Sequence, residues 1–276
     1  MEAEKLTKTA NDIRILTMKE LGHLGVGHVG GCLSVAEMLS VLYFGQMNVD
    51  PKNPKMEGRD RLVMSKGHAG PALYATLALK GFFPEELLYT LNTLGTNLPS
   101  HCDMQRTPGV DMTAGSLGQG ISCAAGMAKA VKIKGEDSWV FCILGDGESQ
   151  EGQVWEASAF AAQQGLDRLI VLLDYNKMQI DGTVDEINTL GDPALRWESF
   201  GFHCQRVDGH DCEALSNAID SAKAAKGKPS MIICDTVKGK GVSFVEKLGI
   251  SNHNCTVSKE QLEEALSELG EVRQHG

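Results

Sequence analysis

The chain has 276 residues, of which 42% are hydrophobic and 22% are charged, and its formal net charge is −10 at pH 7. This composition is ordinary for a globular protein, and we expect one domain over residues 1–276. The acidic excess argues against nucleic acid as a main partner, because neutralising phosphates needs a basic surface. No apolar run reaches the roughly 18–20 residues of a membrane span, and the first residues lack a signal-peptide core.

Eight cysteines are spread singly along the chain and form no C-x-x-C pair. Several lie in apolar or small-residue runs. We therefore expect reduced, partly buried thiols in a cytoplasmic protein, and neither a disulfide framework nor a zinc site.

The first half of the chain has the pattern of helices separated by loops. Apolar or small residues recur at helical spacing from residue 4 onward, and the phrase Ser-Val-Ala-Glu has the form of a capping box. In chain order we expect a helix at 4–21, a glycine-rich loop at 22–31, a helix from Ser34 to about Phe44, a polar loop at 50–60, a strand at 61–64, helices at 71–80 and 84–91, and a loop at 92–113.

The second half alternates short apolar runs with helical patterns. Ser116 begins a helix dense in glycine and alanine, which lets another backbone approach closely. After it we expect, in chain order, a strand at 139–144, a helix at 151–163, strands at 169–173 and 203–207, a helix at 211–224, a strand at 231–234 and an amphipathic helix at 258–269. This alternation favours an α/β fold with a parallel sheet and helices on both faces.

The tripeptide Gly-Asp-Gly at residues 145–147 is the most informative motif. It follows an apolar run, so it lies at the carboxyl end of a predicted strand, where ligands bind in open α/β sheets. Asp146 offers a carboxylate, Asn176 an amide oxygen and Met178 a backbone carbonyl. These three hard oxygens suit octahedral Mg²⁺ on a diphosphate, with Ca²⁺ as the alternative ion. The competing interpretation is two unrelated turns after strands.

A second glycine-rich segment, Ala-Gly-Ser-Leu-Gly-Gln-Gly, occupies residues 114–120. No strand leads directly into it, so a dinucleotide-binding fingerprint is disfavoured. The glycines instead favour a helix start whose backbone N–H groups and dipole face an anion. A close contact between two helices would also explain them.

Four histidines stand in loops of small or polar residues: His28, His68, His101 and His253. Each alone would be interpreted as a structural histidine. Together with a diphosphate site they suggest proton transfer, because imidazole titrates near neutral pH.

These phrases resemble the motifs of transketolase, an enzyme that depends on thiamine diphosphate (ThDP). Ser-Lys-Gly-His-Ala is intact at 65–69, the run Pro-Gly-Val-x-x-x-x-Gly-x-Leu-Gly-Gln-Gly is intact at 108–120, and Lys-Gly-x-Gly stands at 238–241. The likeness covers about residues 14–253 and corresponds to the N-terminal half of the family, with its ThDP-binding fold. Valines at 26 and 29 replace a small polar residue and a proline, changes that bear on which sugar fits, and Asn254 replaces a glycine.

The resemblance implies a role for each matched residue. The metal ion would be held by Asp146, Asn176 and the Met178 carbonyl. The residues in contact with the cofactor would be His68, Gly115, Ser116, Leu117, Gly147, Glu148, Asn176, Lys238 and His253. The catalytic residues would be His28, His101, His253 and Glu151. Glu151 and Glu156 would belong to a proton network between paired sites, or else simply form a solvated helix start.

The resemblance also implies a partner. In transketolases the glutamate that activates ThDP belongs to a pyrimidine-binding domain, which follows the diphosphate-binding domain. This chain ends at Gly276, where that domain would begin, so we expect the pyrimidine-binding and C-terminal domains on a separate subunit. The predicted enzyme transfers a two-carbon ketol unit from a ketose phosphate to an aldose, in an assembly of two copies of each chain. Pentose phosphate metabolism is the default pathway, and a specialised sugar catabolism is the alternative.

Two other functions stay open. Another ThDP enzyme, such as a deoxyxylulose-phosphate synthase or half of a decarboxylating dehydrogenase, would share the Gly-Asp-Gly motif but not the phrases around His28, His68 and His101. A non-catalytic subunit that only holds the cofactor would not need these histidines.

Overall fold

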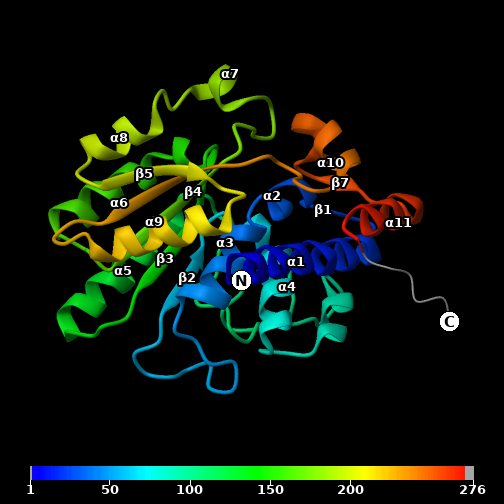
Figure 1. The fold of residues 1–276 in the computed structure, drawn as a ribbon, viewed down its shortest axis with the longest axis horizontal. Coiled ribbons are helices and arrows are strands. Elements are labelled where there is room, and N and C mark those ends of the chain that lie inside the picture. The colour runs from blue at the N-terminus through cyan, green and yellow to red at the C-terminus, as the bar shows by residue number, and fades with distance from the viewer. Residues whose placement is uncertain (1, 271–276) are drawn as a thin grey trace.

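A parallel sheet of five strands forms the centre of the computed structural model. The structure describes residues 2–270. Residues 1 and 271–276 of the expected domain lie outside the described residues. The strand order is β2-β3-β4-β6-β5 (Figure 1). The strands are β2 (Arg61–Met64), β3 (Val140–Gly145), β4 (Leu169–Tyr175), β5 (His203–Asp208) and β6 (Ser230–Asp235). All five coincide with predicted strands to within two residues at each end, and the α/β prediction is confirmed.

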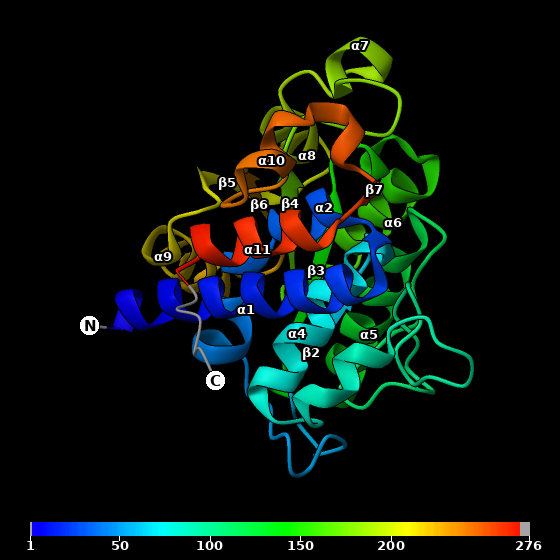
Figure 2. The ribbon, with the colours of Figure 1, turned by 90° about the vertical axis from the view of Figure 1, so that its right-hand side faces the viewer.

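The two faces of the sheet pack against two separate cores. Successive side chains of a strand point to opposite faces, so Phe141 and Ile143 join one core while Cys142 and Leu144 join the other. The first core is closed by α1 (Glu2–Leu24), α3 (Ala36–Val41), α4 (Gly70–Lys80) and α9 (Cys212–Ala224). The second is closed by α5 (Gln119–Lys134), α6 (Gly152–Gln163) and α8 (Pro193–Ser199). Figure 2 shows α11 (Lys259–Glu268) lying beside α1.

The predicted capping box at residue 34 is wrong. Helix α3 begins at Ala36, and no side chain caps its start. Ser34 Oγ instead donates a hydrogen bond to Asp174 Oδ2 at 2.8 Å, and Glu37 pairs with Arg14 at 2.6 Å. The side chains of Ser34 and Glu37 are both buried, and buried polar groups need hydrogen-bond partners. Each finds its partner in a segment distant in the sequence, and not at the start of the helix.

Two other helix predictions are corrected, one in its type and one at its start, and the 34–44 helix is also corrected at its end. The segment predicted as a helix at 84–91 is a 3-10 helix, η3 (Glu85–Thr90), and the end of the 34–44 helix is a π-helix, η1 (Leu42–Gln46). The helix predicted from Ser116 begins at Gln119, because Gly118 has a φ of +83°, which a right-handed helix does not allow.

A small antiparallel ribbon joins the two ends of the chain. Strand β1 (Val26–Gly27) pairs with β7 (Cys255–Thr256), with Val26 opposite Thr256. The sequence did not predict this ribbon, because each strand has only two residues. The remaining elements are α2 (Val29–Leu33), η2 (Gly67–Ala69), η4 (Glu148–Gln150), α7 (Val184–Asn188), α10 (Ser243–Lys247) and η5 (Gly249–Asn252).

Five of the eight cysteines are buried, and all eight carry free thiols. Across residues 2–270, the helices are all too short or too polar to cross a membrane.

Candidate functional site

A pocket of about 200 Å³ opens at the carboxyl ends of β3 and β4. The two strands run in register, with Gly145 opposite Asp174, so the loops that follow them lie next to each other. The pocket is lined by Gly31, Lys66, His68, Leu117, Gly145, Asp146, Gly147, Glu148, Gln150, Glu151, Asn176, Met178, Gln179, Ile180, Asp181, Lys238 and His253. Most of the sequence-predicted site residues are therefore brought together.

Backbone groups fix the carboxylate of Asp146. Its Oδ1 accepts a hydrogen bond from the Gly147 N–H at 2.7 Å, and its Oδ2 accepts one from the Lys177 N–H at 2.5 Å. Burial is the main cause that raises the pKa of Asp146 to about 7, and the charge of Asp174 adds to it. A cation bound at this carboxylate would stabilise its ionised form.

The amide of Asn176 is oriented by its two hydrogen bonds. Its Nδ2 donates to Asp174 Oδ2 at 2.9 Å, so Oδ1 is directed away from that carboxylate and accepts from the Met178 N–H at 3.1 Å. Asp146 and Asn176 therefore present oxygen atoms from two neighbouring loops, as the metal-site hypothesis requires.

Asp174 is the centre of a buried polar network beneath the pocket, which sequence reasoning missed. The carboxylate is fully buried and accepts hydrogen bonds from Lys66 Nζ at 2.5 Å, Ser34 Oγ at 2.8 Å and Thr236 Oγ1 at 2.5 Å, besides Asn176. Burial works to raise its pKa, but the Lys66 charge and these bonds hold it below the ordinary value. The signal in the sequence was Lys66, since a lysine that directly follows a buried strand needs a carboxylate partner.

Glu148 has a structural role in this pocket. Its buried carboxylate accepts hydrogen bonds from Ser65 Oγ at 2.5 Å and from the N–H groups of Gly118 and Gly145 at 2.9 Å each. These bonds tie three loops together. The protein therefore uses three of the roughly four acceptor sites of this carboxylate, which leaves about one, on Oε2, for a cofactor.

Residues of the glycine-rich segment 114–120 line two different cavities. Leu117 lines the pocket at the ends of β3 and β4, whereas Gly115 and Ser116 line a neighbouring cavity of about 660 Å³ together with His101. At the predicted anion-binding helix start, the N–H of Gly118, the residue before α5, donates to the Glu148 carboxylate.

The four predicted histidines form one cluster around His28. Its ring centroid lies 5.5 Å from that of His68, 5.6 Å from that of His101 and 5.3 Å from that of His253. The rings of His68 and His253 are 4.9 Å apart. The β1–β7 ribbon explains this proximity, since it places the loop of His28 beside the loop of His253.

Burial keeps these histidines neutral at pH 7. It is the largest cause lowering the pKa of all four, and nearby positive charge adds to it in three of them. The pKa of His253 falls to about 4, with Lys238 as the second cause. A neutral imidazole can both accept and donate a proton, which suits acid–base work.

His253 is held in place despite the departure at Asn254. The neighbouring Asn252 is buried, and its Nδ2 donates to the carbonyls of Lys238 at 3.1 Å and Val245 at 3.0 Å. A Cβ at Gly30 would lie 2.2 Å from Asn252 Oδ1, so only glycine fits there.

Lys238 contacts both the histidine cluster and one of the predicted metal ligands, the Met178 carbonyl. Its Nζ lies 3.3 Å from His253 Nδ1 and donates to the Met178 carbonyl at 3.2 Å. Burial, followed by the charge of Lys66, lowers the pKa of Lys238 to about 8. A metal ion at the Met178 carbonyl would therefore share this oxygen with Lys238 or displace it.

The two valines that depart from the family pattern differ in their surroundings. Val29 is fully buried in the core, so it cannot touch a sugar, whereas Val26 is 42% exposed in β1. Glu151 lines the pocket at the ends of β3 and β4 and is exposed, and Glu156 is exposed on α6. This exposure is compatible both with a proton network between paired sites and with a solvated helix start.

Comparison with known proteins assigns the chain to a family. The family model for the thiamine diphosphate binding domain of transketolase matches residues 5–274. The chain belongs to the transketolase family. The resemblance found in the sequence motifs is confirmed.

Relatives of this transketolase chain fall into two size classes. It is 56% identical, over 96% of both chains, to the 6-deoxy-6-sulfo-D-fructose transketolase subunit SqwG of a Clostridium species (strain MSTE9). It is 40% identical to one subunit of the apulose-4-phosphate transketolase of Phocaeicola vulgatus, over 89% of this chain and 86% of that one. The transketolase structure from Campylobacter jejuni superposes with a TM-score of 0.91 at 32% identity, over all of this chain but only 44% of that one.

Proposed function

We propose that this chain is the diphosphate-binding subunit of a two-chain, ThDP-dependent transketolase that acts on a sulfonated ketose. The observation that carries the proposal is the placement of the oxygens of Asp146 and Asn176 in one pocket with His68 and His253. In this proposal the whole chain is one diphosphate-binding domain. The pyrimidine-binding and C-terminal domains belong to the partner subunit.

The residues of the pocket fit a metal-bound diphosphate. Asp146, Asn176 and the Met178 carbonyl supply three hard oxygen donors, which suit Mg²⁺ better than a softer ion. Lys238 and His68 stand beside them and can donate hydrogen bonds to phosphate oxygens. When bound, ThDP supplies the carbanion to which a two-carbon ketol unit is transferred.

The histidine cluster handles protons on the sugar. Breaking a carbon–carbon bond next to a hydroxyl releases the hydroxyl proton, and the reverse step on the acceptor needs it back. His28 and His101 are neutral at pH 7 and can take up and return such a proton. Their N–H groups can also stabilise the developing alkoxide by hydrogen bonding.

Exposed apolar side chains around the cofactor pocket support a partner subunit. Leu117 and Ile180 line the pocket and are 38% and 63% exposed. Leu248 and Ile250, each 40% exposed, precede His253 in the chain. A group of large apolar side chains left in solvent is typical of an interaction surface. We infer that the partner covers this opening, in an assembly of two copies of each chain.

The substrate proposal draws on the relative that is 56% identical, whose name specifies 6-deoxy-6-sulfo-D-fructose. A relative that is 40% identical is named for apulose 4-phosphate. Both names favour a specialised sugar catabolism. The pentose phosphate pathway, which we took as the default from the sequence, is therefore the less favoured alternative. The kcat/KM for 6-deoxy-6-sulfofructose should exceed that for fructose 6-phosphate. The opposite order would overturn the substrate proposal alone.

Reconstitution tests the two-chain proposal. Ketol transfer to an aldose acceptor is measured for this chain, for the partner subunit and for their mixture, each with ThDP and Mg²⁺. We expect activity only in the mixture. Full activity of this chain alone would refute the shared site. Turnover of pyruvate by the mixture, without ketol transfer, would instead identify another ThDP enzyme.

A further inference from the structure

A cavity of about 690 Å³ lies at the opposite end of β2 from the cofactor pocket, between the loop that precedes β2 and residues 104–111. It shares no lining residue with the cofactor pocket. Its lining includes five basic side chains, Lys52, Lys55, Arg59, Arg61 and Arg106, and the single carboxylate Asp111. This concentration of positive charge is unexpected in a chain whose net charge is −10.

The charge of the cavity is not neutralised within the protein. Asp111 forms an ion pair with Arg59. It also accepts a hydrogen bond from the N–H of Leu62 at 2.8 Å. Lys55 and Arg61 have no carboxylate within ion-pair distance in residues 2–270. Two positive charges therefore remain available to a ligand.

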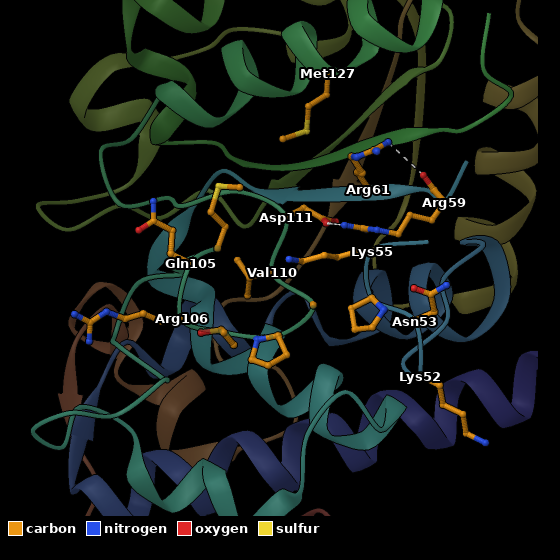
Figure 3. Close-up of a pocket in the computed structure, with 15 residues that line it drawn as sticks. Lys52, Asn53, Lys55, Arg59, Arg61, Gln105, Arg106, Val110, Asp111 and Met127 are labelled. Carbon is orange, nitrogen blue, oxygen red and sulfur yellow. Dashed lines mark hydrogen bonds and ion pairs between the residues drawn. The ribbon is translucent and has the colours of Figure 1, made fainter. Parts of the chain in front are cut away.

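The side chains are arranged to meet a ligand. Figure 3 shows Lys55 directed toward the centre of the pocket, where the Arg59–Asp111 pair lies, and Arg61 between that pair and Met127. Lys52 and Arg106 point away. Arg61 is half-buried, and its guanidinium donates a hydrogen bond to the Arg59 carbonyl at 3.4 Å, which restrains its position. A partly fixed arginine loses less side-chain entropy when it binds an anion.

We propose that this cavity is a binding site for a small phosphate monoester. A phosphate monoester carries about two negative charges at neutral pH, which match the two free cations. An arginine guanidinium can donate two parallel hydrogen bonds to a phosphate, and a lysine adds a point charge. Met104, Val110 and Met127 form an apolar wall for the carbon part of the ligand. The volume falls in the usual range for small-molecule sites, about 300–1,000 Å³.

Calorimetric titration of the purified chain with glycerol 3-phosphate tests the proposal, in the absence of ThDP and divalent cations. The probe is neither a ketose nor an aldose. We expect saturable binding at one site, and the double variant Lys55→Gln, Arg61→Gln should weaken it by at least about tenfold, since each lost bond involves a charged group. The control variant Lys8→Gln, Lys134→Gln makes the same charge change on exposed side chains and should bind as the wild type does.

Two further variants keep the test decisive. Lys55→Gln alone changes an exposed side chain, so the fold is retained and the affinity should still fall. Asp146→Ala disrupts the candidate diphosphate site and should leave glycerol 3-phosphate binding unchanged. The proposal is overturned if no saturable binding is found, if the double variant binds as tightly as the wild type, or if Asp146→Ala abolishes binding.

Discussion

Replacing Arg14 with methionine should destabilise the protein strongly. Arg14 Nη2 donates to Glu37 Oε2 at 2.6 Å, and both side chains are more than nine-tenths buried. His210 Nδ1 is the second partner of Glu37, at 3.0 Å. Because His210 Nε2 accepts from the Val237 N–H at 2.9 Å, Nδ1 carries the ring proton and donates it to Glu37. Arg14→Met leaves the carboxylate with the His210 N–H as its one remaining side-chain donor.

The expected loss follows from burial. Removing one partner of a buried ion pair costs about 3–5 kcal/mol, because the remaining charge loses its compensation. A chain of this size loses about 2–4 °C of melting temperature per kcal/mol, so Arg14→Met should melt about 6–20 °C below the wild type. The matched control is Arg106→Met. Arg106 is exposed and only 3.5 Å from Asp103, so its loss should cost at most about 1 kcal/mol.

The pH dependence of the difference in melting temperature between the wild type and Arg14→Met is a second test. The melting temperatures are measured by calorimetry. Burial works to raise the pKa of Glu37, but the bonds from His210 and Arg14 hold it below the ordinary value. A carboxylate with a lowered pKa stabilises the fold above its unfolded pKa of about 4.3, and this contribution is lost as the pH falls through the lower, folded pKa. The gap between wild type and Arg14→Met should therefore be full at about pH 7 and shrink below about pH 4. Equal melting temperatures at neutral pH would refute the reasoning.

Three more predictions concern the pocket at the ends of β3 and β4 and the neighbouring histidine cluster. Asp146→Ala should abolish ThDP retention by the assembled enzyme, measured by calorimetry with and without Mg²⁺, and unchanged affinity would rule out the metal assignment. His101→Ala should leave ThDP binding intact and reduce kcat by about 10²–10⁴-fold, whereas loss of ThDP would place His101 at the cofactor. Lys66→Met should lower both the melting temperature and the ThDP affinity, because Asp174 would lose the cation that holds it beside Asn176. A melting temperature like that of the exposed control Lys134→Met would contradict this.

Much of the fold could be predicted from the sequence because its signals are local. The strands β3, β4 and β6 are continuous apolar runs, as expected for strands buried on both faces. The order of the strands could not be predicted, since β6 lies between β4 and β5 through contacts distant in sequence. Ser34 failed as a capping residue for the same reason: its partner Asp174 is 140 positions away.

The candidate site divides in a similar way. Asp146 and Asn176 could be placed in one pocket from the sequence, because they follow neighbouring buried strands. The four histidines could be singled out from the sequence, but their individual roles came only from the family resemblance, and the ribbon that brings His253 to His28 has two residues per strand. The roles of Lys66 and Glu148 depend on which loops they touch, and composition carries no such information.

The ribbon between Val26–Gly27 and Cys255–Thr256 also constrains how the protein is made. A ribosome releases the early strand long before its partner emerges, so the cluster of imidazoles cannot assemble until Cys255 and Thr256 have been synthesised. The nascent sheet can form first, because β2 to β6 are complete by Asp235. The four imidazoles therefore come together only after the strands of the sheet have been synthesised.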